Sequence, residues 1–480
     1  MKKKNLNIEK INFFYLIRFF YLLIFSIILI PVIYNYKSNL ILYIIFSLII
    51  LFALFISTDK KNNIVFNFIF FFIFFGFWFK YSLNYLLEFK YISNIGKFDF
   101  YDKNNLDYII KVSIVSVLSF YLPFFLKIKF FNFNLYNHDN YIEYFFKKKR
   151  KIISFFIYFL LISIPVLNFF FNFYEKGKNY DSDKKYFYYF FNFWINYFAP
   201  TLLSYIVFIS IKFDNLKQLF ILILEPLLSS ISILSRWIIL IYYSYFIGII
   251  SSINFKIKNL YLIYLILFFL ISSLVSNFIV YELRELKLLK SYEIKTNLNK
   301  NSNQENIKEV VNKKHYFIDI FLNRFLGIDG VMAVTSSKNQ SFTYFINGIN
   351  FSEVPGKISY YEKNYLFKNT NDNKFFLKDN IISQNSPGII AFLLFSGSEF
   401  FMCIMIFFIT FFLIKLENIL NLLFNNKIFV TFIMFSITYR IFHFGYDPLN
   451  SYKFFVSLCI CLLSIVLINR IMKFYHDKIT

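Results

Sequence analysis

Residues 39–57 read NLILYIIFSLIILFALFIS, nineteen residues without a charged side chain. A helix rises about 1.5 Å per residue, so about 20 apolar residues span the hydrocarbon core of a bilayer. Residues 14–33 form a similar run just before this stretch, and further apolar runs follow almost to the C-terminus. The sequence therefore predicts a chain that crosses a membrane several times.

The composition of the whole chain agrees with a membrane protein. Of its 480 residues, 58% are hydrophobic and only 16% are charged, whereas soluble domains carry about 25% charged residues. This balance excludes a cytoplasmic enzyme, a disordered scaffold and a secreted disulfide-rich module. Cys403, Cys459 and Cys461 all lie in apolar runs without C-x-x-C spacing or clustered His, so no disulfide framework and no metal site is predicted.

The formal net charge of +23 does not by itself indicate a nucleic-acid partner. The abundance of Lys, Asn, Ile, Tyr and Phe is typical of an AT-rich coding bias, so the number of lysines carries less weight than their positions. We expect no nucleic-acid binding. The positions of the basic residues instead bear on the orientation of the chain in the membrane.

The apolar segments predict an all-α fold, a polytopic transmembrane helical bundle of about twelve spans. The first span has the charge order of a signal sequence but no small-residue cleavage site, so a retained helix is predicted. The chain divides into a membrane domain at 1–280 with about nine spans, a large loop at 281–387 and a membrane domain at 388–480 with about three spans. The predicted spans are 14–33, 39–57, 64–83, 107–126, 152–173, 190–211, 218–235, 237–253, 259–280, 388–414, 428–446 and 453–470.

The basic loop residues predict the orientation. When the spans alternate in direction, these residues fall on one side of the membrane, which the positive-inside rule identifies as the cytoplasm. Both termini are then cytoplasmic and the loop 281–387 is extracytoplasmic. The residues concerned are Lys2, Lys3, Lys4, Lys10, Lys60, Lys61, Lys147, Lys148, Lys149, Arg150, Lys151, Lys256, Lys258, Arg470 and Lys473.

Within the large loop, residues 315–334 read HYFIDIFLNRFLGIDGVMAV. Their apolar residues recur at helical spacing, but the stretch is too polar to cross a bilayer. It is predicted to form an amphipathic helix or helix pair on the outer membrane surface. Arg324 and Asp329 flank Gly327 there; glycine lets a backbone approach a ligand, and arginine can hold a phosphate through two parallel hydrogen bonds.

Ionisable residues inside predicted spans are candidate functional groups, because one at the centre of a membrane helix costs at least about 2.5–3.5 kcal/mol. Glu225 lies in LFILILEPLLSSISILSRW, residues 219–237, with Arg236 at the predicted outer end. On one helix the two residues would share a face, with Glu225 about 16 Å deeper, and they could line a cavity that opens outward. Alternatively, Arg236 only reaches the interface and Glu225 is a neutral or hydrogen-bonded group beside Pro226.

The predicted eleventh span ends with TYRIFHFGYDPLN at residues 438–450. Arg440, His443 and Asp447 fall on one polar stripe of this helix. A guanidinium that binds phosphate or carboxylate, a histidine that titrates near neutral pH and a carboxylate that orients it form a plausible acid/base group. Alternatively, the stripe is an interfacial cluster at which Asp447 and the next proline end the helix.

Glu399 is the acidic residue of FSGSEFF, residues 395–401, near the middle of the predicted tenth span. The small residues beside it predict close helix packing or a polar cavity.

These features together resemble the bacterial O-antigen or oligosaccharide repeat-unit polymerases. The shared features are about twelve spans, cytoplasmic termini, one large outer loop late in the chain and arginines at the outer face. The residues that carry the resemblance are Glu225 with Arg236, Arg324 with Asp329, and Arg440 with His443.

The resemblance implies a membrane glycosyltransferase of the bacterial inner membrane that needs no metal and no cofactor. It transfers a glycan linked to polyprenyl pyrophosphate onto the end of another, with inversion. Its partners would be that lipid-linked glycan, the lipid bilayer and other polysaccharide-assembly membrane proteins. The resemblance implies that Arg236, Arg324 and Arg440 bind the diphosphate and neighbouring sugar. Candidate bases are Glu225, Asp329 and His443, and candidate substrate-binding residues are Glu399 and Asp447.

Three alternatives stay open. A lipid-linked oligosaccharide flippase or another polytopic transporter usually consists of two related halves, which the sequence does not show. Another type of lipid-sugar glycosyltransferase has a carboxylate in its first outer loop, but YNYKSN at residues 34–39 contains no acid. A noncatalytic scaffold would leave the charged residues inside the spans without a role.

Overall fold

The computed structural model describes residues 13–59, 62–89, 95–126, 141–142, 150–175, 184–212, 221–235, 244, 247–248, 271, 275–276, 278–280, 282–284, 286, 325, 327–351, 359–366, 386–424, 426–444 and 448–479. Every regular element in these ranges is a helix, which confirms the all-α prediction. The α-helices are α1 (Phe13–Asn35), α2 (Leu40–Ser57), α3 (Ile64–Ile73), α4 (Lys80–Leu86), α5 (Lys103–Phe125), α7 (Arg150–Phe171), α8 (Lys185–Phe193), α9 (Ala199–Lys212), α10 (Ile221–Ser232), α15 (Ile328–Thr335), α16 (Phe342–Asn350), α17 (Ile389–Leu394), α18 (Glu399–Leu423), α19 (Lys427–Phe444) and α20 (Pro448–Ile479), and the π-helical segments are η1 (Phe74–Phe79), η3 (Trp194–Phe198) and η5 (Glu362–Leu366).

Six helices of the described chain are long and apolar enough to cross a bilayer, so the protein is a polytopic helical membrane protein. The predicted spans at 237–253 and 259–280 fall almost entirely outside the described residues, and the total of twelve stays a prediction. The six helices are Ile17–Asn35, Leu40–Ser57, Ile64–Leu86, Lys103–Phe125, Glu399–Leu423 and Ser451–Lys478.

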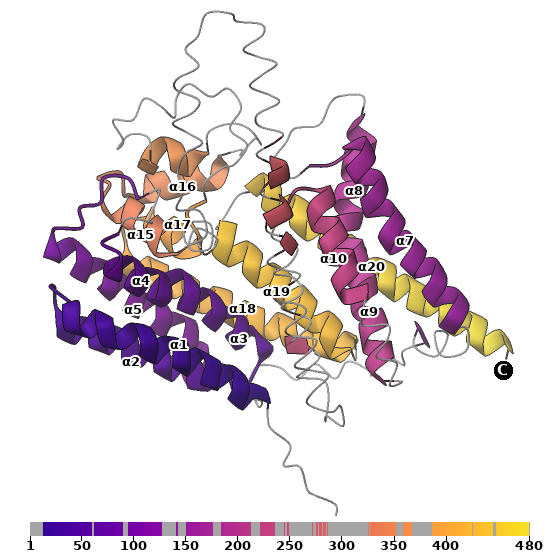
Figure 1. Cartoon of the computed structure of the whole chain (residues 1–480), viewed down its shortest axis with the longest axis horizontal. Coiled ribbons are helices and arrows are strands. Elements are labelled where there is room, and N and C mark those ends of the chain that lie inside the picture. The colour runs from indigo at the N-terminus through magenta and orange to yellow at the C-terminus, as the bar shows by residue number, and fades with distance from the viewer. Residues whose placement is uncertain are drawn as a thin grey trace, which may run out of the picture.

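The helices form a bundle that Figure 1 shows in three parts. Helices α1 to α5 lie on the left, α18 and α19 run through the middle, and α7 to α10 lie on the right with α20. Helix α19 joins the parts, because it packs against α3, α18 and α9. The interior is rich in aromatic rings; Phe68, for example, meets Phe435 edge to face at 5.1 Å, a geometry that stabilises ring pairs beyond their burial.

Polar contacts at the helix ends define two ends of the bundle. At end 1, where α1 begins and α2 ends, Arg18 Nε donates to Thr58 Oγ1 at 2.9 Å. At end 2, where α1 ends and α2 begins, Ser38 Oγ donates to Asp107 Oδ1 at 2.8 Å. Helices α1, α2, α3–α4 and α5 therefore alternate in direction, as predicted. Which end faces the cytoplasm stays a prediction from the basic loops.

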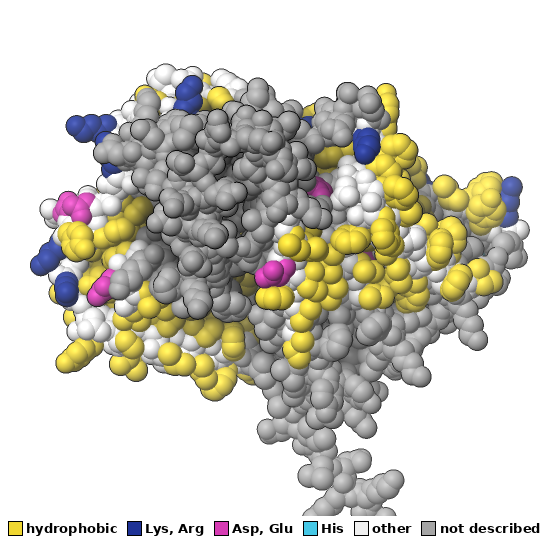
Figure 2. Space-filling view, turned by 45° about the horizontal axis from the view of Figure 1, so that its top comes forward, with side chains coloured by type: hydrophobic (Ala, Val, Ile, Leu, Met, Phe, Trp, Pro, Cys, Tyr) yellow, Lys and Arg dark blue, Asp and Glu magenta, His cyan; other side chains and the backbone are white. Residues whose placement is uncertain are grey.

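The long helices expose apolar side chains on their outer flanks. In the first half of α18, from Phe400 to Phe412, the exposed residues recur every fourth position, whereas Met402, Ile406 and Thr410 are buried. Figure 2 shows many hydrophobic side chains along the lower left edge of the molecule. Such a flank is typical of a surface that lies against lipid. The exposed large hydrophobic residues of α18 are Phe400, Ile404, Phe408, Phe412 and Leu422.

The predicted span at 388–414 is wrong in its boundaries. The short helix α17 ends at Leu394, the chain turns at Gly397 with φ of 73°, and a new helix begins at Glu399. Ser398 caps this helix by accepting a hydrogen bond from the Phe401 N–H. The continuous apolar composition concealed the break, although Gly397 and the neighbouring serines are the residue types that produce one.

Helix α19 ends part-way along the bundle. Its last turn carries Phe442, whose ring stacks on Phe72 with centroids 5.4 Å apart. Phe72 is the ninth residue of the 23-residue span Ile64–Leu86, so this contact lies about 12 Å along that helix. Immediately before α17, a Cβ on Gly388 would lie 3.0 Å from the Phe442 carbonyl oxygen. Helix α17 therefore begins where α19 ends, between the membrane helices.

Helix α15 also lies inside the bundle, so the prediction that residues 315–334 lie on the membrane surface is wrong for residues 327–334. All residues of α15 from Ile328 to Val334 are buried, and the helix packs against α5 and α17. Gly327 touches the middle of the third span, since a Cβ there would lie 2.6 Å from the Gly76 carbonyl oxygen. Residues 315–324 lie outside the described part of the chain.

Candidate functional site at a buried ion pair

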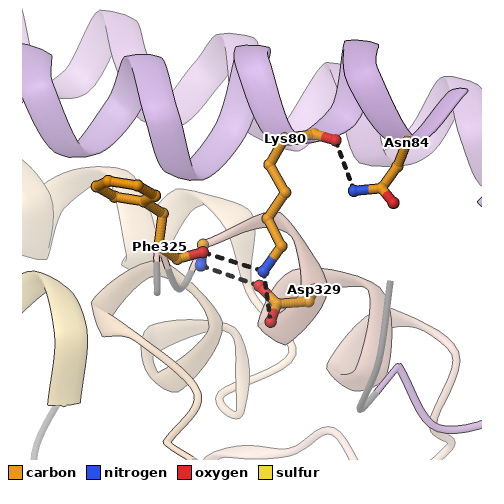
Figure 3. Close-up of polar contacts among 5 residues, drawn as sticks. Lys80, Asn84, Phe325 and Asp329 are labelled. Atoms are coloured by element: carbon orange, nitrogen blue, oxygen red, sulfur yellow. Dashed lines mark hydrogen bonds and ion pairs between the residues drawn. The ribbon is translucent and has the colours of Figure 1, made fainter. Parts of the chain in front are cut away.

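Lys80 and Asp329 form a buried ion pair between a membrane helix and α15. The Lys80 Nζ lies 3.0 Å from Asp329 Oδ2, and the side chains are 0% and 5% exposed. Figure 3 shows the ammonium group between the Asp329 carboxylate and the backbone of Phe325. Lys80 Nζ also donates to the Phe325 carbonyl oxygen at 3.0 Å. The pair connects residues 249 positions apart in the chain.

The local structure around each partner explains the pairing. Lys80 directly follows η1, and a π-helical segment contains an extra residue that changes which side of the helix the next residues face. Asp329 lies in the first turn of α15, where a carboxylate interacts favourably with the helix dipole. Its Oδ1 accepts a hydrogen bond from the Gly327 N–H at 3.1 Å. Because Gly327 lacks a side chain, this loop can approach η1 closely.

Asp329 has polar neighbours, and these neighbours are largely hydrogen-bonded. In η5, Glu362 accepts a hydrogen bond from the Ser359 N–H at 2.9 Å. Burial raises the pKa of Tyr361 above its usual value, and the negative charges of Asp329 and Glu362 add to that rise. The charges of Lys80 and Asp329 neutralise each other in this buried region. We interpret the pair as a positioning element that holds α15 against the third span.

Asp329 is therefore buried and paired with Lys80, and the prediction that it lies at the surface is wrong. The prediction failed because an amphipathic sequence has the same pattern whether its carboxylate faces water or a buried lysine. Arg324 itself lies outside the described residues, and so do Arg236 and Asp447. No geometry is assigned to these three candidates.

Glu225 is fully buried on α10, which packs against α7. Ser229, one turn later, donates to Glu225 Oε1 at 2.7 Å. The other carboxylate oxygen, Oε2, accepts no hydrogen bond from the described residues. Helix α10 ends at Ser232, and Leu234 takes a positive φ of 51°. The predicted continuous helical face from Glu225 to residue 236 is therefore wrong.

Arg440 lies on α19 among buried neighbours and is itself partly buried. It is two residues before Phe442, so its backbone lies part-way along the bundle rather than at the outer end predicted from the sequence. Its charge acts on the hydroxyl of Tyr197 in η3. His443 follows on the last turn of the same helix, but only its backbone is described.

Glu399 is the first residue of α18 and is partly buried, so it does not lie near the middle of a span. Its carboxylate lies close to the side chain of Tyr108 on α5. A carboxylate in the first turn of a helix also interacts favourably with the helix dipole. These contacts fix the start of α18 against α5.

Among the predicted site residues that the structure describes, Glu225, Asp329 and Arg440 lie on three different helices. In Figure 1, α15 with Asp329 lies to the left of the upper end of α19, whereas α10 with Glu225 lies to its right. Arg440 belongs to α19, between the two. The sequence analysis missed Lys80, although it is a lone charged residue in a predicted span and meets the criterion that selected Glu225.

Comparisons with known protein families, with curated proteins and with solved structures give no match. The fold and the buried charged residues are therefore the basis for a functional proposal.

Proposed function

We propose that the protein polymerises oligosaccharide repeat units linked to polyprenyl pyrophosphate, at the outer face of the bacterial inner membrane. The observation that best supports this proposal is the position of Arg440. Helix α19 is buried from Ile428 to Tyr439, and it carries this guanidinium close to the point where it ends against α17. A cation at such a position in a membrane helix is costly and usually serves an anionic ligand or a polar pathway. A diphosphate is the anion that a guanidinium fork binds well.

The proposed reaction forms a glycosidic bond between a hydroxyl of the acceptor glycan and the anomeric carbon of the donor glycan. The bond between that carbon and the pyrophosphate oxygen breaks, and polyprenyl pyrophosphate leaves as an anion. Arg440, with Arg236 and Arg324, would stabilise the charge that develops on the leaving group. Glu225 or His443 would accept the proton of the acceptor hydroxyl. Asp329 has a positioning role instead, because its carboxylate is paired with Lys80.

The test uses cells that lack the gene and express a variant from a plasmid. Lysine keeps the charge of Arg440 but not the planar fork, so Arg440→Lys should reduce the ratio of long-chain glycan to single repeat units by about a hundredfold. The matched control is Arg18→Lys, at end 1, where the arginine donates to Thr58 and lies over the Phe55 ring. The control should keep normal chain lengths at equal protein abundance. Normal chain lengths in Arg440→Lys would contradict the proposed role.

A lipid-linked oligosaccharide flippase is the second candidate. It is favoured by the meeting of α17 and α19 inside the bundle, because transporters bind substrates where membrane helices are interrupted. A flippase moves the lipid-linked glycan across the bilayer without lengthening it. Loss of the gene would then remove all external glycan, whereas loss of a polymerase would leave single repeat units outside.

A further inference from the structure

Helix α16 is fixed to the bundle by one of its faces. Phe345 meets Phe401, in the first turn of α18, with ring centroids 5.1 Å apart. It also meets Phe392 of α17 at 5.3 Å. The N–H of Ser341, which caps α16, donates to the Phe395 carbonyl oxygen at 2.9 Å. Helix α16 therefore lies at the break between α17 and α18, near end 2.

The rest of the α16 surface is divided into an apolar and a polar face. Successive residues of a helix are about 100° apart, so Phe342 and Ile346 share one direction, and they are 56% and 38% exposed. Thr343 and Asn347 share a second direction about 100° away and are also exposed. A short helix with a buried, an apolar and a polar face fits a boundary between protein, lipid and water.

The apolar face of α16 continues the lipid-facing flank of α18. Phe342 contacts the ring of Phe401, with centroids 5.7 Å apart. The adjacent Phe400 begins the row of exposed residues that runs along α18. Because α18 is a membrane span, this row lies against lipid acyl chains.

We propose that α16 lies in the membrane interface at end 2 and inserts Phe342 and Ile346 among phospholipid acyl chains, with Thr343 and Asn347 in the aqueous headgroup region. The partner is the lipid surface itself. This contact fixes the depth of the break between α17 and α18 in the bilayer. The proposal concerns lipid contact and does not depend on which reaction the protein performs.

The test places single cysteines at 342, 346, 343 and 347 in a protein whose Cys403, Cys459 and Cys461 are replaced by alanine. Each variant is purified and reconstituted in vesicles of phosphatidylethanolamine and phosphatidylglycerol. A water-soluble maleimide is then added to vesicles made permeable to it, so that both membrane faces are accessible. Cysteines at 343 and 347 should react at least about tenfold faster than those at 342 and 346, because an apolar environment disfavours the reactive thiolate.

A nitroxide attached at the same positions gives a second readout. At 342 and 346 it should be more accessible to oxygen, which dissolves in lipid, than to a water-soluble nickel chelate, and at 343 and 347 the order should be reversed. Equal maleimide rates at all four positions would show that the two faces do not differ in their contact with lipid and would overturn the proposal. Protection at 342 and 346 in native membranes but not in the reconstituted vesicles would assign the face to a partner protein and would also overturn it.

Discussion

The ion pair between Lys80 and Asp329 gives a prediction that can be worked out from its geometry. Asp329→Asn leaves the ammonium group of Lys80 buried without its counter-charge, while the Phe325 carbonyl still accepts its hydrogen bond. Lys80→Met leaves the carboxylate buried with the Gly327 N–H as its described donor. Breaking a buried pair by removing one partner costs about 3–5 kcal/mol, because an uncompensated charge stays in a low-dielectric site.

The double variant Lys80→Met with Asp329→Asn removes both charges. It should therefore be clearly more stable than the sum of the two single effects predicts, with a coupling free energy of about 2 kcal/mol or more. The control is Lys103→Met, which removes an exposed lysine at the start of α5. This control should change stability by less than about 0.5 kcal/mol.

The assay is equilibrium unfolding of the purified protein in mixed micelles with rising amounts of sodium dodecyl sulfate, followed by circular dichroism. Additive effects in the double variant would refute the ion pair. Single variants as stable as the Lys103→Met control would show that α15 is not held against the third span by these charges.

Two further stability predictions use the same assay. Glu417 accepts hydrogen bonds from the N–H groups of Ile64 and Val65, at the start of α3, at 2.9 and 3.0 Å. Glu417→Gln keeps one acceptor oxygen and should lower the free energy of unfolding by about 1.5–3 kcal/mol. Asn418→Ala on the exposed side should lower it much less, and equal losses in the two variants would show that Glu417 does not cap α3. Gly327→Ala should lower the free energy of unfolding by about 1–3 kcal/mol and weaken the ion pair of Lys80 with Asp329, because the added Cβ would overlap the Gly76 backbone. An unchanged free energy of unfolding would show that the loop around Gly327 relaxes freely.

The apolar runs predicted the fold correctly wherever one uninterrupted helix forms the span. The run at 39–57 became α2, and the run at 107–126 corresponds to α5. In such helices the length and the absence of charge decide the outcome. Composition alone does not show where a run is interrupted, which is why the break between α17 and α18 was missed although Gly397 lies in it.

The candidate site was less predictable for a physical reason. A carboxylate or guanidinium is identified by sequence, but its partner and depth depend on packing between distant segments. Asp329 was identified but assigned to the surface, and Lys80, its partner, was overlooked. Arg440 was identified as a charged residue of a span, but its depth follows from the contact between Phe442 and Phe72, which no local pattern reveals.

The most direct test of the proposed function is polymerisation by the purified protein. The protein is reconstituted in vesicles with oligosaccharide repeat units on polyprenyl pyrophosphate, isolated from the source cells after deletion of the gene, and the glycan lengths are measured by mass spectrometry. The proposal predicts products of two or more repeat units and one polyprenyl pyrophosphate released for each bond formed, with both lost in Arg440→Lys and retained in Arg18→Lys. Transfer of intact single repeat units across the vesicle membrane without any lengthening would contradict the polymerase proposal and assign the protein to transport.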